Sequence, residues 1–301
     1  MLFKATVSET TLPGQQPLVS IYIATQNRPL LLARAISSCV AQSYPNIEII
    51  VVDDGSKAEL AAQNQQLLRL YPQINYVYLP QPSGAPAARN TAIKMALGEF
   101  ITGLDDDDEF TPQRISDFVR HWQLLDNYAF LCSGYRVVTS DKRRHDFGRK
   151  ATVITQQQLL YANLVGNQVF TTTEKLRTIG GFDNRLPSCQ DYDTWLRLAE
   201  TFGKGYRIAG CSYILHQDHA FARISASERR EQGYQMLLQK HRHLMNRAQL
   251  ASQQVNFALF NDKAMPWHAF WRLPVLQYPR VLKIVLLQLW ARWRAQSGAR
   301  A

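Results

Sequence analysis

The sequence predicts an α/β protein in which helices flank a mostly parallel central sheet. Three observations predict this fold class. Short apolar runs rich in branched and aromatic residues alternate with segments of helical periodicity. Two of the apolar runs end in aspartates, at positions 53–54 and 105–108. The excess of basic residues belongs to the C-terminal quarter, where residues 226–301 hold 12 Lys and Arg against 3 Asp and Glu.

The first half of the chain reads as three strand–helix units and a further strand. Pro29 can open the first helix, because its fixed φ suits the first helical position. Right-handed crossovers place the carboxyl ends of parallel strands at one edge of the sheet, so the acid-bearing loops should meet there. The expected strands are 18–24, 47–52, 74–79 and 100–104, and the expected helices are 30–42, 58–70 and 87–97.

The second half is more mixed. A domain over residues 17–224 followed by a helical, basic extension over 225–301 is the expected organisation. Up to residue 224 we expect helices at 112–125, 156–162 and 191–202, strands at 129–138, 167–171 and 206–215, and a charged hairpin or loop at 141–150. In the extension we expect one basic helix over 225–250 and another over 280–294, with an apolar arc of Leu282, Val285, Leu286, Leu289, Trp290 and Trp293.

Composition narrows the class of protein. The chain is 46% hydrophobic and 19% charged, as expected for a soluble globular protein. Its four cysteines are scattered without a C-x-x-C pair, which favours reduced thiols and a cytoplasmic location. No apolar run reaches the roughly 18–20 residues of a membrane span, and no signal peptide is expected. The charge of residues 1–225 is almost balanced, which argues against a nucleic-acid partner.

The aspartate run at 105–108 is the strongest chemical signal. Four adjacent carboxylates raise one another's pKa, and a divalent cation bound by oxygen ligands relieves that repulsion. An EF-hand loop does not fit, because positions 6 and 12 counted from Asp105 are Phe110 and Ser116 rather than Gly and Glu. The alternative is a solvated acidic turn. We expect a metal site that serves a phosphate-bearing substrate.

Three other candidates are ambiguous when taken alone. Asp54 could accept hydrogen bonds from a nucleobase, or Asp-Gly-Ser could simply form a good turn. Arg89 could neutralise a phosphate at a helix N-terminus, or lie on the surface. Asp191 could be functional, although an acidic residue in the first turn of a helix is favourable without any function.

Taken in order, the motifs are more specific. Residues 19–28, 42–56, 84–90, 104–108, 181–183 and 190–197 together resemble the family 2 inverting glycosyltransferases, whose fold is GT-A, a Rossmann-like sheet flanked by helices. The resemblance covers roughly residues 17–220. Segments 166–170, 190–193 and 214–219 are most similar to bacterial exopolysaccharide enzymes of the colanic-acid type.

The resemblance implies roles for individual residues. Asp191 matches the catalytic base, and Asp105 with Asp107 matches the D-x-D motif that binds Mg²⁺ or Mn²⁺, Asp107 directly. The family usually has an aromatic residue at Gln26 and often Glu at Gln190, so base stacking at Gln26 is in question. The implied nucleotide-sugar-binding residues are Thr25, Asn27, Arg28, Asp54 (at the uracil), Arg89, Asp105, Asp106 (as a bystander of the metal pair) and Asp108 (near the sugar).

The implied reaction moves a hexose from a nucleotide sugar, UDP-sugar before GDP-sugar, to a lipid-linked oligosaccharide. A non-catalytic sugar-nucleotide-binding component would be expected to lack the D-x-D motif or the base. A nucleotidyltransferase would need a glycine-rich basic loop where residues 25–29 stand. Tryptophans interleaved with arginines in residues 265–301 predict peripheral contact with the anionic inner face of the membrane, or a helix packed on the core.

Overall fold

The computed structural model describes residues 16–217, 227–261, 263–279 and 281–286. A ten-stranded sheet runs through it in the order β3-β2-β1-β4-β9-β6-β10-β5, with β7 paired to β6 and β8 to β10. The strands are β1 Val19–Thr25, β2 Ile47–Asp53, β3 Asn75–Tyr78, β4 Phe100–Asp105, β5 Glu109–Phe110, β6 Leu131–Thr139, β7 Arg144–Phe147, β8 Thr152–Ile154, β9 Phe170–Thr172 and β10 Gly205–Gln217.

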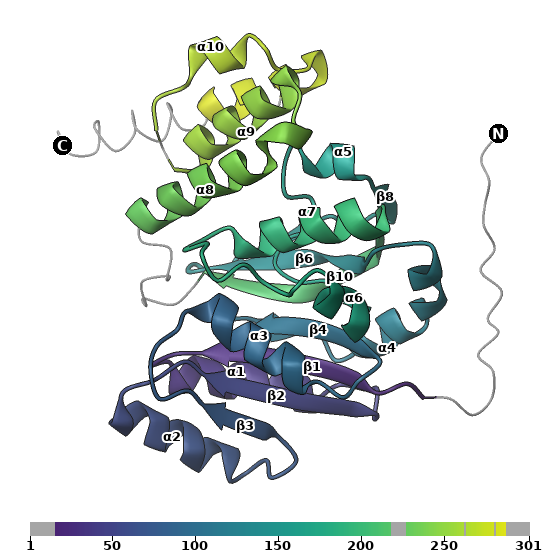
Figure 1. Ribbon diagram of the computed structural model, residues 1–301, viewed down its shortest axis with the longest axis vertical. Helices are drawn as coiled ribbons and strands as arrows, with labels where there is room; N and C mark the ends of the chain where they lie inside the picture. Colours follow the sequence, from purple (N-terminus) through teal and green to yellow (C-terminus); the bar gives the residue numbers. More distant parts are fainter. Residues whose placement is uncertain (1–15, 218–226, 262, 280, 287–301) are drawn as a thin grey trace.

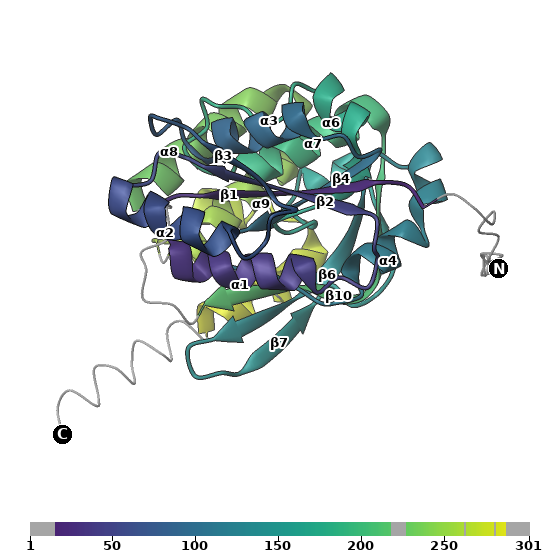
Figure 2. The same cartoon turned by 90° about the horizontal axis from the view of Figure 1, so that it is seen from below.

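Helices cover both faces of this sheet (Figures 1 and 2). In Figure 2, α1 lies on one face of β1, and α3 and α7 lie on the other. The helices are α1 Pro29–Val40, α2 Ala58–Leu68, α3 Ala85–Met95, α4 Arg114–Val119, α5 Gln156–Leu159, α6 Thr173–Thr178, α7 Gln190–Phe202, α8 Ser227–His241, α9 Arg247–Phe260 and α10 Trp267–Phe270, with 3-10 turns η1 Trp122–Asp126, η2 Arg242–Leu244 and η3 Val275–Gln277.

The first four strands of the path form the predicted parallel sheet. β1 pairs in parallel with β2 and β4, and β2 pairs with β3. Successive residues of β1 enter opposite core layers: Tyr22 belongs to the layer of α3 and α7, and Ile21 and Ile23 belong to the layer of α1. The register aligns Thr25 with Asp53 and Ala24 with Asp105. The carboxyl ends of β1, β2 and β4 therefore meet at one edge, as the sequence predicts.

The second half of the sheet joins the first through β9. This strand pairs antiparallel with β4 over three residues and with β6 through the single pair Leu131 and Phe170. Phe170 is fully buried and stacks between Phe100 and Phe118, at centroid distances of 5.2 and 5.0 Å. β6 and β10 continue the sheet as parallel neighbours. An aromatic stack and few hydrogen bonds thus connect the two halves.

The C-terminal helices pack against α7 (Figure 1). Tyr234 and Leu237 of α8 lie in the same core cluster as Trp195 of α7. The prediction of a single helix over 225–250 is wrong, because Asn246 caps the start of a second helix. The Asn246 side chain accepts a hydrogen bond from the Gln249 N–H, and the Gln249 side chain bonds back to Asn246, which forms a capping box. The predicted boundary at 224–225 lies outside the described residues.

Two other expectations differ from the structure. The helix predicted over 112–125 is divided into α4 and the 3-10 turn η1, and the two-residue strand β5 was not expected. β5 forms because Phe110 pairs antiparallel with Tyr213 of β10, a partner distant in sequence. Of the helix predicted over 280–294, residues 281–286 are helical and the remainder lies outside the described residues. Among the described helices, none combines the length and the apolar character needed to cross a bilayer.

Candidate active site

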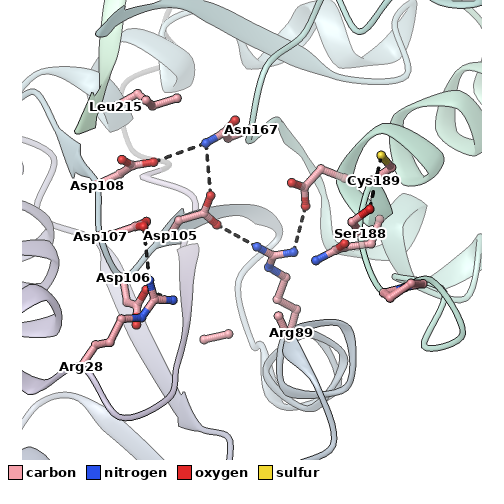
Figure 3. Close-up of a pocket in the computed structure, with 15 residues that line it drawn as sticks. Arg28, Arg89, Asp105, Asp106, Asp107, Asp108, Asn167, Ser188, Cys189 and Leu215 are labelled. Atoms are coloured by element: carbon pink, nitrogen blue, oxygen red, sulfur yellow. Dashed lines mark hydrogen bonds and ion pairs between the residues drawn. The ribbon is translucent and has the colours of Figure 1, made fainter. Parts of the chain in front are cut away.

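A cleft of about 270 Å³ lies at the edge where the parallel strands end (Figure 3). Its walls come from the ends of β1 and β4, the first turns of α3 and α7, and β10. The charged lining residues are Arg28, Arg89, Asp105, Asp106, Asp107, Asp108 and Asp191, and Asn167 adds an amide. The topology therefore gathers acids and arginines from segments more than a hundred residues apart.

Arg89 links the two acidic groups that the sequence placed far apart. Its Nη2 lies 2.8 Å from Asp105 and its Nη1 lies 2.9 Å from Asp191. Burial opposes the charge of Arg89, but the two carboxylates raise its pKa above the ordinary value. The guanidinium also lies over the Phe182 ring, 5.1 Å from its centroid. A single cation is therefore shared between the D-x-D segment and the first turn of α7, as Figure 3 shows.

Asp191 lies in the first turn of α7, on the wall of the cleft opposite β4. Burial raises the pKa of its carboxyl to about 6; Arg89 lowers it and Asp105 raises it further. The side chain keeps 25% of its surface exposed, so the carboxylate can be reached from the cleft. A partly exposed carboxylate with a pKa near 6 can accept a proton at neutral pH.

The aspartate run divides into four different environments. Asp105 accepts hydrogen bonds from Asn167 and Gln168 in addition to Arg89, at 3.2 and 3.0 Å. Both of its carboxylate oxygens are therefore occupied by protein donors. Asp107 lies 3.2 Å from Arg28, and its side chain is 17% exposed. Asp107 is thus turned further toward the cleft than its buried neighbours.

Asp106 is more than a bystander within the fold. It is 1% exposed, accepts a hydrogen bond from Thr25 at 2.7 Å, and pairs with Arg28 at 2.8 Å. Burial raises its pKa to about 7, although Arg28 and the Thr25 hydroxyl favour the charged form. Asp106 therefore ties the end of β4 to the loop after β1.

Asp108 is buried beneath the cleft and held by β10. It accepts hydrogen bonds from the Tyr213 hydroxyl at 2.8 Å and from the His216 N–H at 2.9 Å. Burial and the neighbouring carboxylates raise its pKa well above the ordinary value. With 2% of its surface exposed, Asp108 orients β10 against the aspartate run.

The residues fit a divalent cation in their chemistry but supply few ligands. Carboxylate oxygens are the donors that Mg²⁺ and Mn²⁺ prefer. Among the described residues, no group of three His, Cys, Asp or Glu side chains converges on a single point. A cation beside Asp107 would therefore take most of its ligands from substrate phosphates and water, as Mg²⁺ commonly does.

A second, adjoining hollow of about 330 Å³ contains the expected nucleoside-side residues. Asp54 accepts hydrogen bonds from the backbone N–H groups of Ser83 and Gly84, at 2.7 and 2.8 Å, and so shapes the loop before α3. The Gln26 side chain donates to the Asp54 carbonyl at 2.7 Å. This hollow is lined by Ala24, Thr25, Gln26, Arg28, Asp54, Pro82, Gly84, Ala85 and Arg229.

Asn27 connects loops and does not line either hollow. It adopts a left-handed backbone conformation with φ of 58°. Its N–H donates to Ser56 Oγ at 2.7 Å, and its side chain accepts from the Lys57 N–H at 2.8 Å. Its contacts therefore fix the loop after β1 to the turn after β2.

The sequence did not predict three residues that line the two hollows or contact Asp105. Asn167 and Gln168 were expected only as the start of a strand, yet their side chains bond Asp105. Arg229 comes from α8, 175 positions after Asp54, and no local pattern indicates that it lines the nucleoside-side hollow. For Asn167 and Gln168, the available signal was two amides directly before a buried apolar segment.

Comparisons with known proteins identify relatives of this chain. The sequence model described as glycosyl transferase family 2 matches residues 20–177. The putative colanic acid biosynthesis glycosyl transferase WcaA of Escherichia coli K12 is 36% identical over 83% of this chain and 91% of its own length. The putative teichuronic acid biosynthesis glycosyltransferase TuaG of Bacillus subtilis is 28% identical over 66% of this chain and 78% of its own length.

Two solved structures share the fold. Residues 1–349 of S. aureus TarS, in complex with UDP-GlcNAc, superpose with a TM-score of 0.63 at 17% identity, over 88% of this chain and 79% of theirs. The mannosyltransferase PcManGT of Pyrobaculum calidifontis, in complex with GDP-Man and Mn²⁺, gives 0.53 at 16% identity, over 96% and 81%. These matches support the predicted α/β glycosyltransferase fold.

Proposed function

The chain belongs to glycosyltransferase family 2, and we propose that it moves a hexose from a UDP-sugar to a growing, lipid-linked oligosaccharide in bacterial exopolysaccharide synthesis. The observation that carries the proposal is the Arg89 bridge between Asp105 and Asp191. It brings the D-x-D segment and a reachable carboxylate to one cleft. Transfer between a donor diphosphate and an acceptor hydroxyl requires these two groups together.

The donor occupies both adjoining hollows in this proposal. Arg28 and Arg89 line the cleft and offer positive charge to a diphosphate. Thr25 and Asp54 line the nucleoside-side hollow, where Asp54 has lone pairs left for a base N–H. The UDP-GlcNAc in the TarS complex supports a uridine nucleotide, and the GDP-Man in PcManGT keeps guanosine as the alternative.

Asp107 and Asp105 would hold Mg²⁺ or Mn²⁺ together with the donor phosphates. The Mn²⁺ in the PcManGT complex supports metal use in this fold. When bound, the cation would neutralise charge on the departing nucleoside diphosphate. Asp107 is the first ligand in this assignment, since its side chain lines the cleft and is 17% exposed, whereas both oxygens of Asp105 already accept hydrogen bonds.

Asp191 is the proposed base. Its carboxylate accepts the proton of the acceptor hydroxyl while that oxygen forms a bond to the anomeric carbon. The bond from the anomeric carbon to the donor phosphate breaks in the same displacement, and the diphosphate leaves with the electron pair. One displacement inverts the anomeric centre. The raised pKa of Asp191, about 6, matches a base that works near neutral pH.

The acceptor is assigned from the relatives and from the C-terminal surface. The names of WcaA and TuaG refer to the biosynthesis of colanic acid and of teichuronic acid. Residues 263–286 expose Trp267, Trp271 and Leu276 at 56, 71 and 92% of their surface, beside exposed basic side chains such as Arg272. Exposed tryptophans beside arginine suit the interface of an anionic membrane. We therefore assign peripheral contact at the cytoplasmic face to this segment.

Vesicle binding tests the membrane assignment separately from catalysis. The Trp271→Gln variant should sediment less with vesicles containing phosphatidylglycerol, and the wild-type chain should stay in solution with phosphatidylcholine vesicles. Phe257→Leu serves as a core-packing control, because the Phe257 ring stacks on Tyr234, with their centroids 4.3 Å apart, and is not one of the exposed tryptophans. Equal sedimentation of wild type and Trp271→Gln would reject this surface.

Asp191→Asn tests the catalytic assignment. The variant keeps the shape of the side chain but cannot accept the proton, so we expect kcat to fall by about 10²–10⁴-fold while UDP affinity changes little. A panel of UDP- and GDP-sugars with Mn²⁺ or Mg²⁺ should first identify the donor. Near-normal turnover of Asp191→Asn would refute the base. Tight nucleotide-sugar binding without wild-type turnover on any acceptor would favour a non-catalytic binding component.

A further inference from the structure

The residues on either side of Asp191 contact the C-terminal helices. Asp191 itself faces the cleft and pairs with Arg89. The polar side chains of Ser188, Tyr192 and Asp193 instead have partners in α8 and α9. Figure 1 shows α8 next to α7. The family 2 sequence match ends at residue 177, before all of these segments.

Asp193 is the most strongly held of the three. Its carboxylate is completely buried. Oδ1 lies 2.7 Å from Lys240 Nζ and 2.9 Å from His241 Nε2, both in the last turn of α8. Oδ2 lies 2.8 Å from Arg197 Nε, one turn further along α7. Hydrogen bonds from these groups lower the Asp193 pKa despite burial, so the carboxylate remains charged and bound.

Lys240 extends this contact to the loop before α7. Its Nζ also lies 2.8 Å from Asp183 Oδ2, in the turn that follows α6. Asp183 in turn receives hydrogen bonds from Arg185. The ammonium group of Lys240 therefore joins three segments: the end of α8, the first turn of α7, and the loop at residues 183–185.

Two uncharged contacts hold the same region. Gln253 of α9 donates to the Tyr192 hydroxyl at 2.5 Å and to the Leu160 carbonyl at 2.9 Å. At the other end, α8 approaches so closely at Gly233 that an added Cβ would lie 2.3 Å from Ser188 Oγ. The Ser188 hydroxyl donates to the Arg230 carbonyl at 3.2 Å. The segment before Asp191 is thus held as firmly as the residues after it.

Helix geometry explains why these contacts set the direction of Asp191. Residues two positions apart on an α-helix point about 200° apart. Asp193 therefore points into α8 when Asp191 points into the cleft. Any rotation of the first turn of α7 that moves Asp191 away from the cleft must pull Asp193 from Lys240 and His241.

We propose that Lys240 and His241 are positioning residues for the base: by holding Asp193 they fix the first turn of α7 so that Asp191 faces the acceptor. This inference rests on the proposed function, in which Asp191 is the base. It gives the C-terminal helices a role in turnover beyond any contact with a membrane. The acceptor reaction should depend on them, and nucleotide binding should not.

The decisive variant is Lys240→Met, which keeps the aliphatic stem and removes the ammonium. A displacement of about 1 Å at a reacting group can cost about 10²-fold in rate. We therefore expect kcat to fall 10- to 100-fold, while donor KM and the UDP dissociation constant stay within about twofold. Lys240→Arg restores a cation and should recover most of kcat. Lys263→Met is the matched control, because Lys263 pairs with Glu231 at the surface of the same helical region.

A double mutant distinguishes positioning from general damage. In an Asp191→Asn background, Lys240→Met should reduce the residual rate no further, because the group it positions is already lost. Additive loss, or a parallel loss of UDP affinity, would overturn the inference. So would wild-type kcat in folded Lys240→Met. If Asp191→Asn alone had no effect, the proposed base would fail first, which is a different result.

A second variant covers the case in which Lys240→Met does not fold. His241→Ala leaves Asp193 with Lys240 and Arg197, so the buried carboxylate stays neutralised. We expect kcat to fall several-fold with donor KM unchanged and with a circular dichroism spectrum like that of the wild type. An unchanged kcat in folded His241→Ala would reject His241 as a positioning residue. Lys240 would then be tested by Lys240→Arg, which should keep most of kcat and the wild-type donor KM.

Discussion

Two acidic clusters lie at the ends of β2 and β4, the strands on either side of β1, and their surroundings differ. At the end of β2, the Asp53 carboxylate receives hydrogen bonds from Ser56, Asn64 and Tyr76, all neutral groups, at 2.8–2.9 Å. At the end of β4, arginines pair with Asp105, Asp106 and Asp107. The first cluster is satisfied by its own fold, and the second gathers cations. Asp53 therefore serves the fold, whereas the aspartates after β4 form part of the candidate site.

This contrast predicts that Asp53 matters mainly for stability. Asp53 is fully buried and makes three charge-assisted hydrogen bonds. Asp53→Ala should lower the free energy of unfolding by about 4–5 kcal/mol, because each of the three bonds contributes at least about 1.5 kcal/mol and its buried partners lose their acceptor. Urea unfolding measures the change. A stable Asp53→Ala protein with weakened UDP binding would reverse the assignment of the two clusters.

The β4 cluster should show the opposite pattern. Asp107→Ala removes a partly exposed carboxylate, so it should change stability little. Its affinity for UDP in the presence of Mn²⁺ should fall at least about 100-fold, because even the loss of a group that only supports a metal ligand can cost that much. Titration calorimetry measures the UDP affinity with and without Mn²⁺. Thr152→Ala, on the edge strand β8, is the control. Unchanged Mn²⁺-dependent affinity in Asp107→Ala would remove Asp107 from the metal site.

The smallest expected effect is the pH dependence of kcat/KM, which should follow Asp191 and not the cluster after β2. Asp191 acts in its charged form, and burial raises its pKa to about 6. The charged form predominates above that pH and is lost as the pH falls through it. We expect kcat/KM to fall about tenfold per pH unit below pH 6. Asp54→Asn, at the β2 cluster, should keep the same acidic limb with weaker donor binding. An acidic limb that moves in Asp54→Asn would assign the titration elsewhere.

The parallel strands β1 to β4 and the helices between them were largely predictable, because local sequence patterns determine them. Apolar runs of strand length, helical periodicity and turn residues between them fix a parallel order, and strand register then brings Asp53 and Asp105 to one edge. The family resemblance added the pairing of that edge with Asp191. Each of these steps needs only the chain pattern or the motif order.

The other features depend on partners that no local pattern reveals. Asp106 is buried and bound by Thr25 and Arg28, contacts that the sequence did not predict. The break between α8 and α9 follows from the Asn246 cap, which a continuous basic segment obscures. Contacts of Asp193 with Lys240 join residues 47 positions apart, and tertiary packing alone brings them together.

The junction at β9 has a consequence for building hybrid enzymes. The donor half and the acceptor half meet through a short antiparallel strand and through the rings of Phe100, Phe118 and Phe170. Few backbone bonds would have to be matched if the two halves came from different relatives. The three rings come from both sides of that junction, so a chimera would have to inherit them as one set. Within the sheet, recombination at this junction would have to preserve the shape of one aromatic stack.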